Sequence, residues 1–381
     1  MGLVKFGDLV KEVKINIDRN NNPYEYYVAG DHMDSEDLTI RRKGLFATDD
    51  VGPAFTRLFK PGQILYGSRR TYLKKVAVAD FEGVCSNTTF VLETKDESRL
   101  RQRLLPFIML TEDFTKWSIS KSKGSTNPYI LFSDLANYEF ELPDIHRQDE
   151  LVELLWQAYA TKESYREMIR ATDEMVKSQF IEQIGDSRSN PRKWDVFTLK
   201  EIVLPSCPIS YGIVQPGDDL PDGVPIVRPV DLDETHLVTS KGLKKTSKEI
   251  SEAYKRTVLK GDELLLCVRG TTGLVGLATP ELKGCNVTRG ITPLAFKDSI
   301  DRVFMLCMFL SDGIQEFIAD NTIGSALRGI NMSVIRDMKI PVPPLDVQKH
   351  FARLYKQADK SKFELKQAIE KIDKVMRAFM Q

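Results

Sequence analysis

The chain repeats itself at an offset of 200 residues, and this duplication constrains its fold more than any other feature. The identities include Lys60 and Lys260, Leu65 and Leu265, Arg69 and Arg269, Thr71 and Thr271, Cys85 and Cys285, Gly124 and Gly324, Pro143 and Pro343, and Gln148 and Gln348. One ungapped register covers roughly a hundred positions, a period far too long for a solenoid. The sequence therefore predicts two copies of one unit, each a globular domain followed by a long helix.

The composition is that of an ordinary globular protein. The 381 residues suit two domains, and the hydrophobic (42%) and charged (28%) fractions are typical of water-soluble chains. No apolar run of about 18 residues is present to span a membrane, and the N-terminus lacks the pattern of a signal peptide. The five cysteines form no CxxC pair, which favours reduced thiols in the cytoplasm over a zinc site.

Each globular half has the pattern of a mixed α/β domain rich in short strands. Residues 64–66 and 76–78 flank a polar turn, and residues 263–267 and 274–277 do the same in the second copy. One helix is expected to follow in each copy, over 100–117 and 303–319, and a polar, glycine-bearing loop follows each helix, at 118–129 and 321–329. The second domain begins near Trp194, after a polar linker.

Two segments, residues 144–185 and 344–381, have the heptad periodicity of long helices. The apolar heptad positions include Leu151, Leu154, Ala158, Tyr165 and Met168 in the first segment, and Phe351, Leu354, Ala358, Leu365 and Ile372 in the second. Thr161 and Ser361 interrupt both stripes at the same place. About 38 residues at roughly 1.5 Å each give a rod near 55 Å, too long for the core of one small domain.

The two helical segments also carry opposite charge. The first has five basic and nine acidic side chains, the second nine and five, whereas residues 1–143 and 186–343 are each neutral. Two independent amphipathic helices are the alternative interpretation, but equal length, a matching polar break and opposite charge favour an antiparallel coiled coil. We therefore predict an α/β (α+β) fold with two pseudo-symmetric globular domains, 1–143 and 186–343, separated by that coiled coil.

No catalytic motif is found in the sequence. It has no GxxxxGK[ST] loop, and its four histidines lack metal-ligand spacing. Residues 126–129 resemble the Asn-Pro-Pro-Tyr motif of amino-group DNA methyltransferases but lack one proline, and the equivalent residues 326–329 share nothing with it. A turn made by Asn127 and Pro128 is the simpler interpretation, so the chain is expected to be non-catalytic.

The order of domain, long helix, linker, domain and long helix resembles the specificity (S) subunit of type I restriction-modification systems. The resemblance covers essentially the whole chain. It rests on residues 60–65 with Arg69, residues 260–265 with Arg269 and Gly270, the segment from Leu142 to Gln148, and the segment from Ile340 to Gln348. Each motif is weak alone, but their occurrence twice in the same order is specific.

The resemblance implies two target-recognition domains, each of which reads one half of a bipartite double-stranded DNA target. The helices would separate the half-sites like a ruler and bind two modification subunits, which would carry S-adenosylmethionine. Restriction subunits, which would use ATP and Mg²⁺, would join this complex. The chemistry would then belong to the partners. A coiled-coil interaction scaffold without DNA contact and an autonomous methyltransferase are the alternatives. Salt-dependent DNA binding would distinguish a specificity subunit from the interaction scaffold. The absence of cofactor motifs disfavours the autonomous methyltransferase.

Base and phosphate contacts need Arg, Lys, Asn, Gln, Ser or Thr side chains. The candidates in the first domain are Arg41, Arg42, Lys43, Arg69, Arg70, Thr71, Tyr72, Lys121, Lys123, Thr126 and Asn127. Those in the second are Lys241, Lys244, Lys245, Arg269, Thr271, Thr272, Arg289, Arg328 and Asn331. Charge runs are also typical of solvated faces. Residues kept in both copies are expected to contact phosphate, whereas differing pairs, such as Arg70 against Gly270 and Asn127 against Leu327, are better candidates for base reading.

Overall fold

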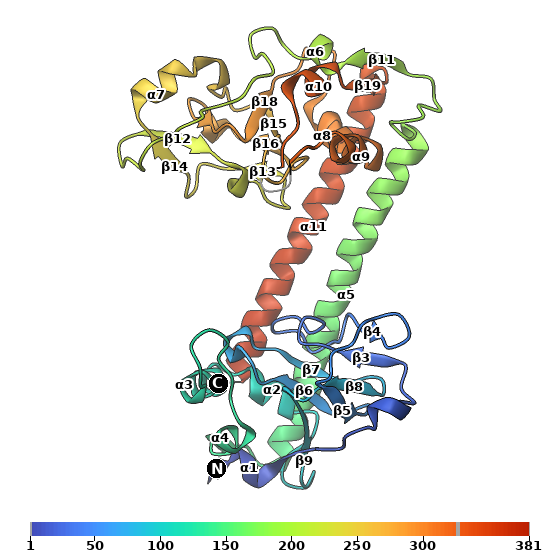
Figure 1. Cartoon of the computed structure of the whole chain (residues 1–381), viewed down its shortest axis with the longest axis vertical. Coiled ribbons are helices and arrows are strands. Elements are labelled where there is room, and N and C mark those ends of the chain that lie inside the picture. Colours follow the sequence, from blue (N-terminus) through green and yellow to red (C-terminus); the bar gives the residue numbers. More distant parts are fainter. Residues whose placement is uncertain (1, 325–327, 381) are drawn as a thin grey trace. The chain divides into compact units, whose positions relative to one another are not determined.

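The chain is divided into two compact units in a computed structural model, which describes residues 2–324 and 328–380. The first unit consists of Met1–Arg166 and Lys366–Gln381, and the second of Glu167–Leu365. Two long helices, α5 (Ile145–Gln183) and α11 (Leu345–Phe379), contribute residues to both units (Figure 1, green and red). The mixed helix-and-strand fold with two long helices confirms the predicted fold class.

Among residues 2–166 and 366–380, the first unit contains two four-stranded sheets and a two-stranded sheet. Their orders are β2-β9-β6-β7, β4-β3-β8-β5 and β1-β10. The strands are β1 (Gly2–Lys5), β2 (Val10–Glu12), β3 (Tyr26–Val28), β4 (Gly44–Leu45), β5 (Phe55–Phe59), β6 (Ile64–Gly67), β7 (Val76–Val78), β8 (Gly83–Ser86), β9 (Thr89–Thr94) and β10 (Glu139–Leu142). The helices before α5 are α1 (Phe6–Leu9), η1 (Arg19–Asn21), η2 (Thr71–Leu73), α2 (Leu105–Leu110), α3 (Glu112–Lys121) and α4 (Phe132–Leu135).

The second unit repeats this plan, with sheet orders β13-β16-β15-β18, β14-β12-β17 and β11-β19. The strands are β11 (Asp195–Thr198), β12 (Val224–Val227), β13 (Leu237–Val238), β14 (Lys244–Thr246), β15 (Leu264–Cys267), β16 (Val275–Ala278), β17 (Asn286–Val287), β18 (Ile291–Leu294) and β19 (Lys339–Val342). The helices before α11 are α6 (Leu199–Ile202), η3 (Pro229–Asp231), α7 (Lys248–Ala253), η4 (Lys255–Thr257), η5 (Pro280–Leu282), α8 (Arg302–Leu310), α9 (Asp312–Asp320) and α10 (Met332–Asp337). The predicted strand–turn–strand patterns are confirmed as β6–β7 and β15–β16.

The prediction of one helix over 100–117 and one over 303–319 is wrong in the same way in both units. The structure has two helices in each place, α2 and α3, and α8 and α9, and the breaks fall at Thr111 and Ser311. Both residues are extended, and each hydroxyl donates to the carbonyl three residues earlier, on Ile108 (2.8 Å) and Met308 (2.7 Å). A hydroxyl side chain that hydrogen-bonds to the nearby backbone favours a helix boundary. Apolar periodicity does not detect this bond, so it missed both breaks.

The duplicated glutamines Gln148 and Gln348 join the start of each long helix to its own domain. The Gln148 amide oxygen accepts from the backbone N–H of Arg101 (3.0 Å), and Gln348 accepts from Asp301 (2.9 Å). The amide groups donate to two backbone carbonyls each, one of them on Pro143 or Pro343. Both side chains are almost fully buried, so the identity at an offset of 200 reflects a repeated structural bond.

The ladder between the central strands shows that the ungapped register is interrupted. Leu65 of β6 pairs with Val91, but the equivalent Leu265 of β15 pairs with Pro293. The offset between β9 and β18 is therefore 202, two residues larger than the offset of 200 between Leu65 and Leu265. Cys85 and Cys285 do not occupy equivalent positions, and their identity in the ungapped register is coincidental.

The polar breaks in the two long helices lie beside duplicated ion pairs. In the first unit Lys162 Nζ lies 2.7 Å from a carboxylate oxygen of Asp373, and in the second unit Lys362 lies 2.7 Å from Asp173. These four residues are two equivalent pairs at an offset of 200. Each unit therefore holds the beginning of one long helix beside the end of the other, as an antiparallel pair requires.

The buried stripes of the helices differ in part from the predicted heptad positions. Leu151, Phe351 and Ala358 are buried, and Ala158, Tyr165, Leu354, Leu365 and Ile372 are half-buried. Leu154 and Met168 are 39% and 52% exposed, so these two are not part of the packed stripe. Val152 and Tyr159 are buried instead, because the first half of α5 packs against the core of its own domain and not only against α11.

Candidate nucleic-acid interface

Two loops that are far apart in the sequence are joined in the first unit. The turn after β6 is bridged to the loop between α3 and α4 by Arg69 and Tyr129, and Tyr129 also pairs with Lys123. The backbone N–H of Arg70 donates to the carbonyl of Pro128 (2.7 Å), and that of Ile130 donates to Ser68 (2.9 Å). Two predicted groups of DNA-binding residues, 69–72 and 121–127, therefore lie on one continuous surface, which we call loop pair 1.

The second unit builds the same arrangement. Arg269 is bridged to Gly329, and Gly329 also pairs with Ile323. The N–H of Gly270 donates to the carbonyl of Arg328 (3.0 Å), and that of Ile330 donates to Val268 (3.0 Å). We call this surface loop pair 2. Residue 327, the predicted counterpart of Asn127, lies outside the described residues.

Backbone conformation explains part of the sequence at these loops. Arg70 and Gly270 both have a positive φ, +50° and +82°, as do Gly124 and Gly324 at +88° and +108°. Glycine adopts this region without strain, whereas a non-glycine residue there is uncommon. The repeated Gly124 and Gly324 therefore shape the loop in both units. Arg70 adopts the same left-handed conformation as Gly270, but it carries a charged side chain that Gly270 lacks.

Most of the candidate side chains of loop pair 1 are exposed. Arg69, Arg70, Lys121, Lys123, Thr126 and Asn127 face solvent, and Tyr72 is 53% exposed. Thr71 is buried, and its hydroxyl lies 3.2 Å from that of Ser122. Lys121 lies over the ring of Trp117, with Nζ 4.7 Å from the ring centre, whereas Lys123 is paired with Asp134 at 2.9 Å. Lys121 is thus the more available cation of the two.

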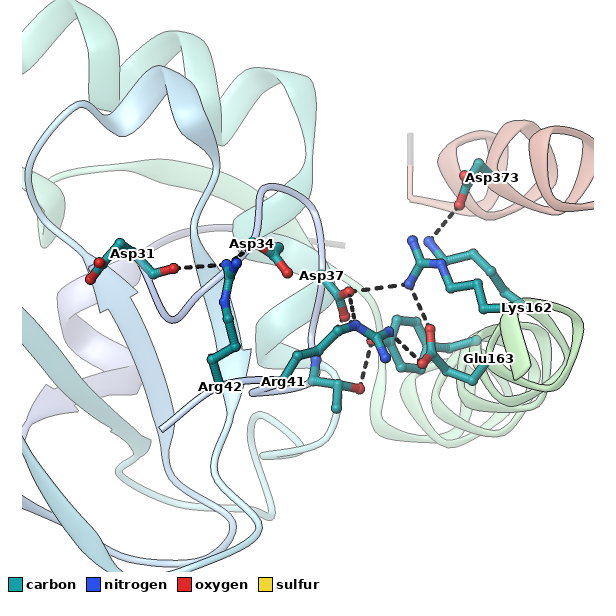
Figure 2. Close-up of polar contacts among 11 residues, drawn as sticks. Asp31, Asp34, Asp37, Arg41, Arg42, Lys162, Glu163 and Asp373 are labelled. Carbon is teal, nitrogen blue, oxygen red and sulfur yellow. Dashed lines mark hydrogen bonds and ion pairs between the residues drawn. The ribbon is translucent and has the colours of Figure 1, made fainter. Parts of the chain in front are cut away.

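The charged groups of Arg41, Arg42 and Lys43 contact other residues of the first unit and not loop pair 1. Figure 2 shows the contacts of Arg41 and Arg42. Arg41 donates to Asp37 (2.7 Å) and to Glu163 of α5 (2.5 Å). Arg42 pairs with exposed Asp34 (2.5 Å). Lys43 Nζ lies 3.4 Å from the centre of the Tyr26 ring. These contacts give Arg41 a structural role within the first unit, and its contact with DNA stays a prediction.

Asp37 is the centre of this polar network. Its side chain is 5% exposed and accepts hydrogen bonds from Tyr159 (2.6 Å), from Arg166 (3.2 Å) and from the backbone of Thr39 (3.0 Å), as well as from Arg41. Burial alone would raise the pKa of Asp37, but the hydrogen bonds and the Arg41 charge outweigh it and lower the pKa below its usual value. The network fixes residues 37–41 on helix α5.

The candidates in the second unit fall into two groups. Lys244 and Lys245 lie in β14, where their amines donate to the carbonyls of Gly217 (3.0 Å) and Pro221 (2.5 Å). Thr272 accepts a hydrogen bond from Thr322 within loop pair 2 (3.2 Å). Lys241, Thr271, Arg289, Arg328 and Asn331 are exposed. The structure therefore brings Arg269, Thr271, Thr272 and Arg328 together in loop pair 2, and not the two lysines of β14.

An aromatic ring that the sequence did not reveal lies beside two cations, one on loop pair 2 and one on the turn between β17 and β18. The guanidinium carbons of Arg269 and Arg289 lie 5.3 Å and 5.8 Å from the centre of the Tyr211 ring. Within residues 2–324 and 328–380, neither arginine forms an ion pair, and Nε of Arg269 is buried without a hydrogen-bond partner. A cation over an aromatic face is attracted electrostatically, so Tyr211 holds two unpaired charges in place. No sequence signal connected Tyr211 with these arginines, because the three lie on different loops.

The described residues show no candidate metal centre and no membrane-spanning helix. Across residues 2–324 and 328–380, no group of three or more His, Cys, Asp or Glu side chains could hold a metal ion. In the same part of the chain no helix is long and apolar enough to cross a membrane. All five cysteines are buried and free, and burial raises the pKa of the Cys85 thiol to about 12.

Comparison with known proteins assigns the family. Residues 10–169 and 191–374 both match the type I restriction modification DNA specificity domain. The chain belongs to this family. The two matches cover both copies of the repeat, so each unit of this specificity-domain protein carries one copy of the family domain.

Individual relatives agree with the assignment. The EcoBI specificity subunit of Escherichia coli is 25% identical over 195 residues, which are 50% of this chain and 41% of that protein. The EcoDI specificity subunit of the same organism is 26% identical over 42% of this chain and 35% of that protein. The match thus spans only about two fifths of these two relatives. The MjaVIII specificity subunit of Methanocaldococcus jannaschii is 21% identical over 98% of this chain and 90% of its own length.

Two solved structures share the fold of this specificity-domain protein along its whole length. One is the type I restriction-modification system S subunit from M. genitalium, with a TM-score of 0.57 and 14% identity, which covers 100% of this chain and 94% of that one. The other is a chain from a study of complex assembly and conformational transition in a type I R-M system, with a TM-score of 0.55, 17% identity and 96% of that chain covered. At these identities the likeness concerns the fold alone.

Proposed function

We propose that the chain is the DNA sequence-specificity subunit of a type I restriction-modification complex, and that each unit reads one half of a bipartite double-stranded DNA target. The observation that carries this proposal is the duplication of the loop pair. Both units hold the same bridged backbone, yet Arg70 and Tyr129 in one unit correspond to Gly270 and Gly329 in the other. Two domains that recognise different DNA sequences require the same backbone arrangement with different side chains.

The partners follow from the family. Two modification subunits would bind S-adenosylmethionine and methylate adenine, and restriction subunits would use ATP and Mg²⁺, on DNA in the cytoplasm. The chain itself would contribute specificity and a scaffold. Helices α5 and α11 support the scaffold role, because each is a continuous helix with residues in both units. We propose that their length sets the separation of the half-sites, and that residues 1–143 and 186–343 are the two recognition domains.

The charge of loop pair 1 gives a direct test of DNA contact. Neutralising Lys121 by Lys121→Ala is expected to weaken binding similarly on all duplex sequences. It should also reduce the slope of log K against log salt by about 0.9, the change expected for one lost phosphate contact. Electrophoretic mobility shifts of the full chain at salt concentrations between roughly 50 and 200 mM measure this slope.

Lys116 is the matched control for this experiment, because it lies on the same helix α3 and pairs with Asp113. It is five residues from Lys121, or about 140° around the helix, so Lys116→Ala should leave the slope unchanged. If the unaltered chain binds no duplex at any salt concentration, it is an interaction scaffold and the proposed function fails. An unchanged slope with an altered sequence preference would make Lys121 a base reader.

A further inference from the structure

A third turn in each unit is bonded to the loop pair. In the first unit the β8–β9 turn is joined to it by the N–H of Ser68, which donates to the carbonyl of Thr88 (3.2 Å). In the second unit the N–H of Val268 donates to the carbonyl of Gly290 in the β17–β18 turn (2.7 Å). With the two-residue shift in register, these bonds make Thr88 equivalent to Gly290.

The preceding residues, Asn87 and Arg289, are therefore equivalent as well. Their backbone N–H groups make corresponding bonds, from Asn87 to the carbonyl of Ala54 (2.8 Å) and from Arg289 to the carbonyl of Ile213 (2.7 Å). The backbone at this position is thus held in the same way in both units. An offset of 200 would pair Arg289 with Thr89 instead, so only the strand ladder shows the equivalence.

The side chains at this position are exposed, and their donor groups have no acceptor among the described residues. Within the described residues, the Asn87 amide makes no side-chain hydrogen bond and the Arg289 guanidinium forms no ion pair. Arg289 is supported from one side by the ring of Tyr211. This differs from Arg41, whose guanidinium is consumed by two carboxylates. Among the described residues, the donor groups of both side chains lack an acceptor, so they are suited to bind an external one.

We propose that Asn87 and Arg289 are base-reading residues, and that they select different bases in the two half-sites. An asparagine amide pairs with N6 and N7 of adenine, and an arginine guanidinium pairs with O6 and N7 of guanine, in the major groove. The half-site of the first unit then contains an adenine read by Asn87, and that of the second a guanine read by Arg289. This inference rests on the proposed function and adds two positions of the target to it.

The test is selection of targets from a randomised duplex library, with the full chain assembled with its modification subunits. The variant Arg289→Asn should lose the preference for guanine at one position of one half-site, by about five- to a hundredfold, and gain a preference for adenine there. The reciprocal Asn87→Arg should replace an adenine with a guanine in the other half-site. Arg289→Lys keeps the charge but loses the bidentate geometry, and should weaken discrimination at that position with little loss of non-specific binding.

Arg256 is the matched control, because it is an exposed arginine of the second unit in η4. Arg256→Asn should leave the selected target unchanged. If the unaltered chain enriches a bipartite target and Arg289→Asn or Asn87→Arg selects the same one, the inference is overturned while the proposed function stands. A change in both half-sites from a single substitution would also overturn it. If the unaltered chain enriches no sequence, the proposed function and the inference fail together.

Discussion

Replacing Asp37 with alanine is expected to lower the free energy of unfolding of the first unit by about 3 kcal/mol. The Asp37 carboxylate is buried and accepts hydrogen bonds from Arg41, Tyr159 and Arg166. Its removal leaves two guanidinium groups with only Glu163 between them and deprives the buried Tyr159 hydroxyl of one partner. Breaking one partner of a buried ion pair costs far more than breaking an exposed one.

Asp34 provides the control, because it also pairs with an arginine of the same segment, but both side chains are about half exposed (57% and 44%). Asp34→Ala should cost no more than about 1 kcal/mol. Urea unfolding followed by circular dichroism gives the free energies, and hydrogen exchange of residues 31–43 assigns the loss to the first unit. Equal effects of the two substitutions would show that the network contributes no more than a surface pair.

The pH dependence of the Asp37 effect has a defined sign. Because the folded state lowers the pKa of Asp37, its contribution is fully present above the unfolded value of about 3.9 and is lost as the pH falls through the folded pKa. The difference in stability between the unaltered chain and Asp37→Ala should therefore be constant near neutral pH and shrink only under acidic conditions, below about pH 4.

Lengthening both long helices by one heptad is expected to change the preferred spacer between the half-sites by about three base pairs. Seven residues add about 10 Å to a helix, which corresponds to three base pairs at roughly 3.4 Å each. The insertions belong between Lys162 and Asp173 in α5 and between Lys362 and Asp373 in α11, because both duplicated ion pairs are then kept. Three base pairs also rotate the DNA by about a quarter turn, so loss of binding to every spacer is the other expected outcome.

Selection from duplexes with randomised spacer length measures this effect. An insertion in α5 alone is the control, because it cannot keep both the Lys162–Asp373 and the Lys362–Asp173 pairs, and it should destabilise the protein instead. If the matched double insertion leaves the spacer and the affinity unchanged, the helices do not set the distance.

The parts of the fold that follow from local pattern could be predicted from the sequence. The heptads predicted α5 and α11 to within two residues, and the apolar runs predicted β6, β7, β15 and β16. The breaks at Thr111 and Ser311 were missed because each depends on a hydrogen bond from one hydroxyl to a backbone carbonyl, and apolar periodicity does not show such a bond. The exposure of Leu154 and Met168 depends on the domain surface against which α5 packs, and no heptad pattern contains that surface.

The candidate site was harder to predict, because charge in a sequence does not reveal its partners. Arg41 and Arg69 look alike as residues, yet Arg41 is held by Asp37 and Glu163, which are 4 and 122 positions away. The Lys162–Asp373 pair joins residues 211 positions apart. Asn87 was missed because the Cys85–Cys285 identity concealed the two-residue shift in register, and only the strand ladder reveals that Asn87 and Arg289 are equivalent.

Exchange of one recognition domain tests the central claim most directly, namely that the two domains read separate half-sites. Residues 1–143 would be replaced by the corresponding domain of another specificity-domain protein, ending before α5 so that Gln148 and the helices are kept. Methylated adenines would then be mapped in the genomic DNA of cells that carry the exchanged chain with its modification subunits. We expect a bipartite target in which one half is new and the other half and the spacer are unchanged. A target altered in both halves, or in neither, would contradict it.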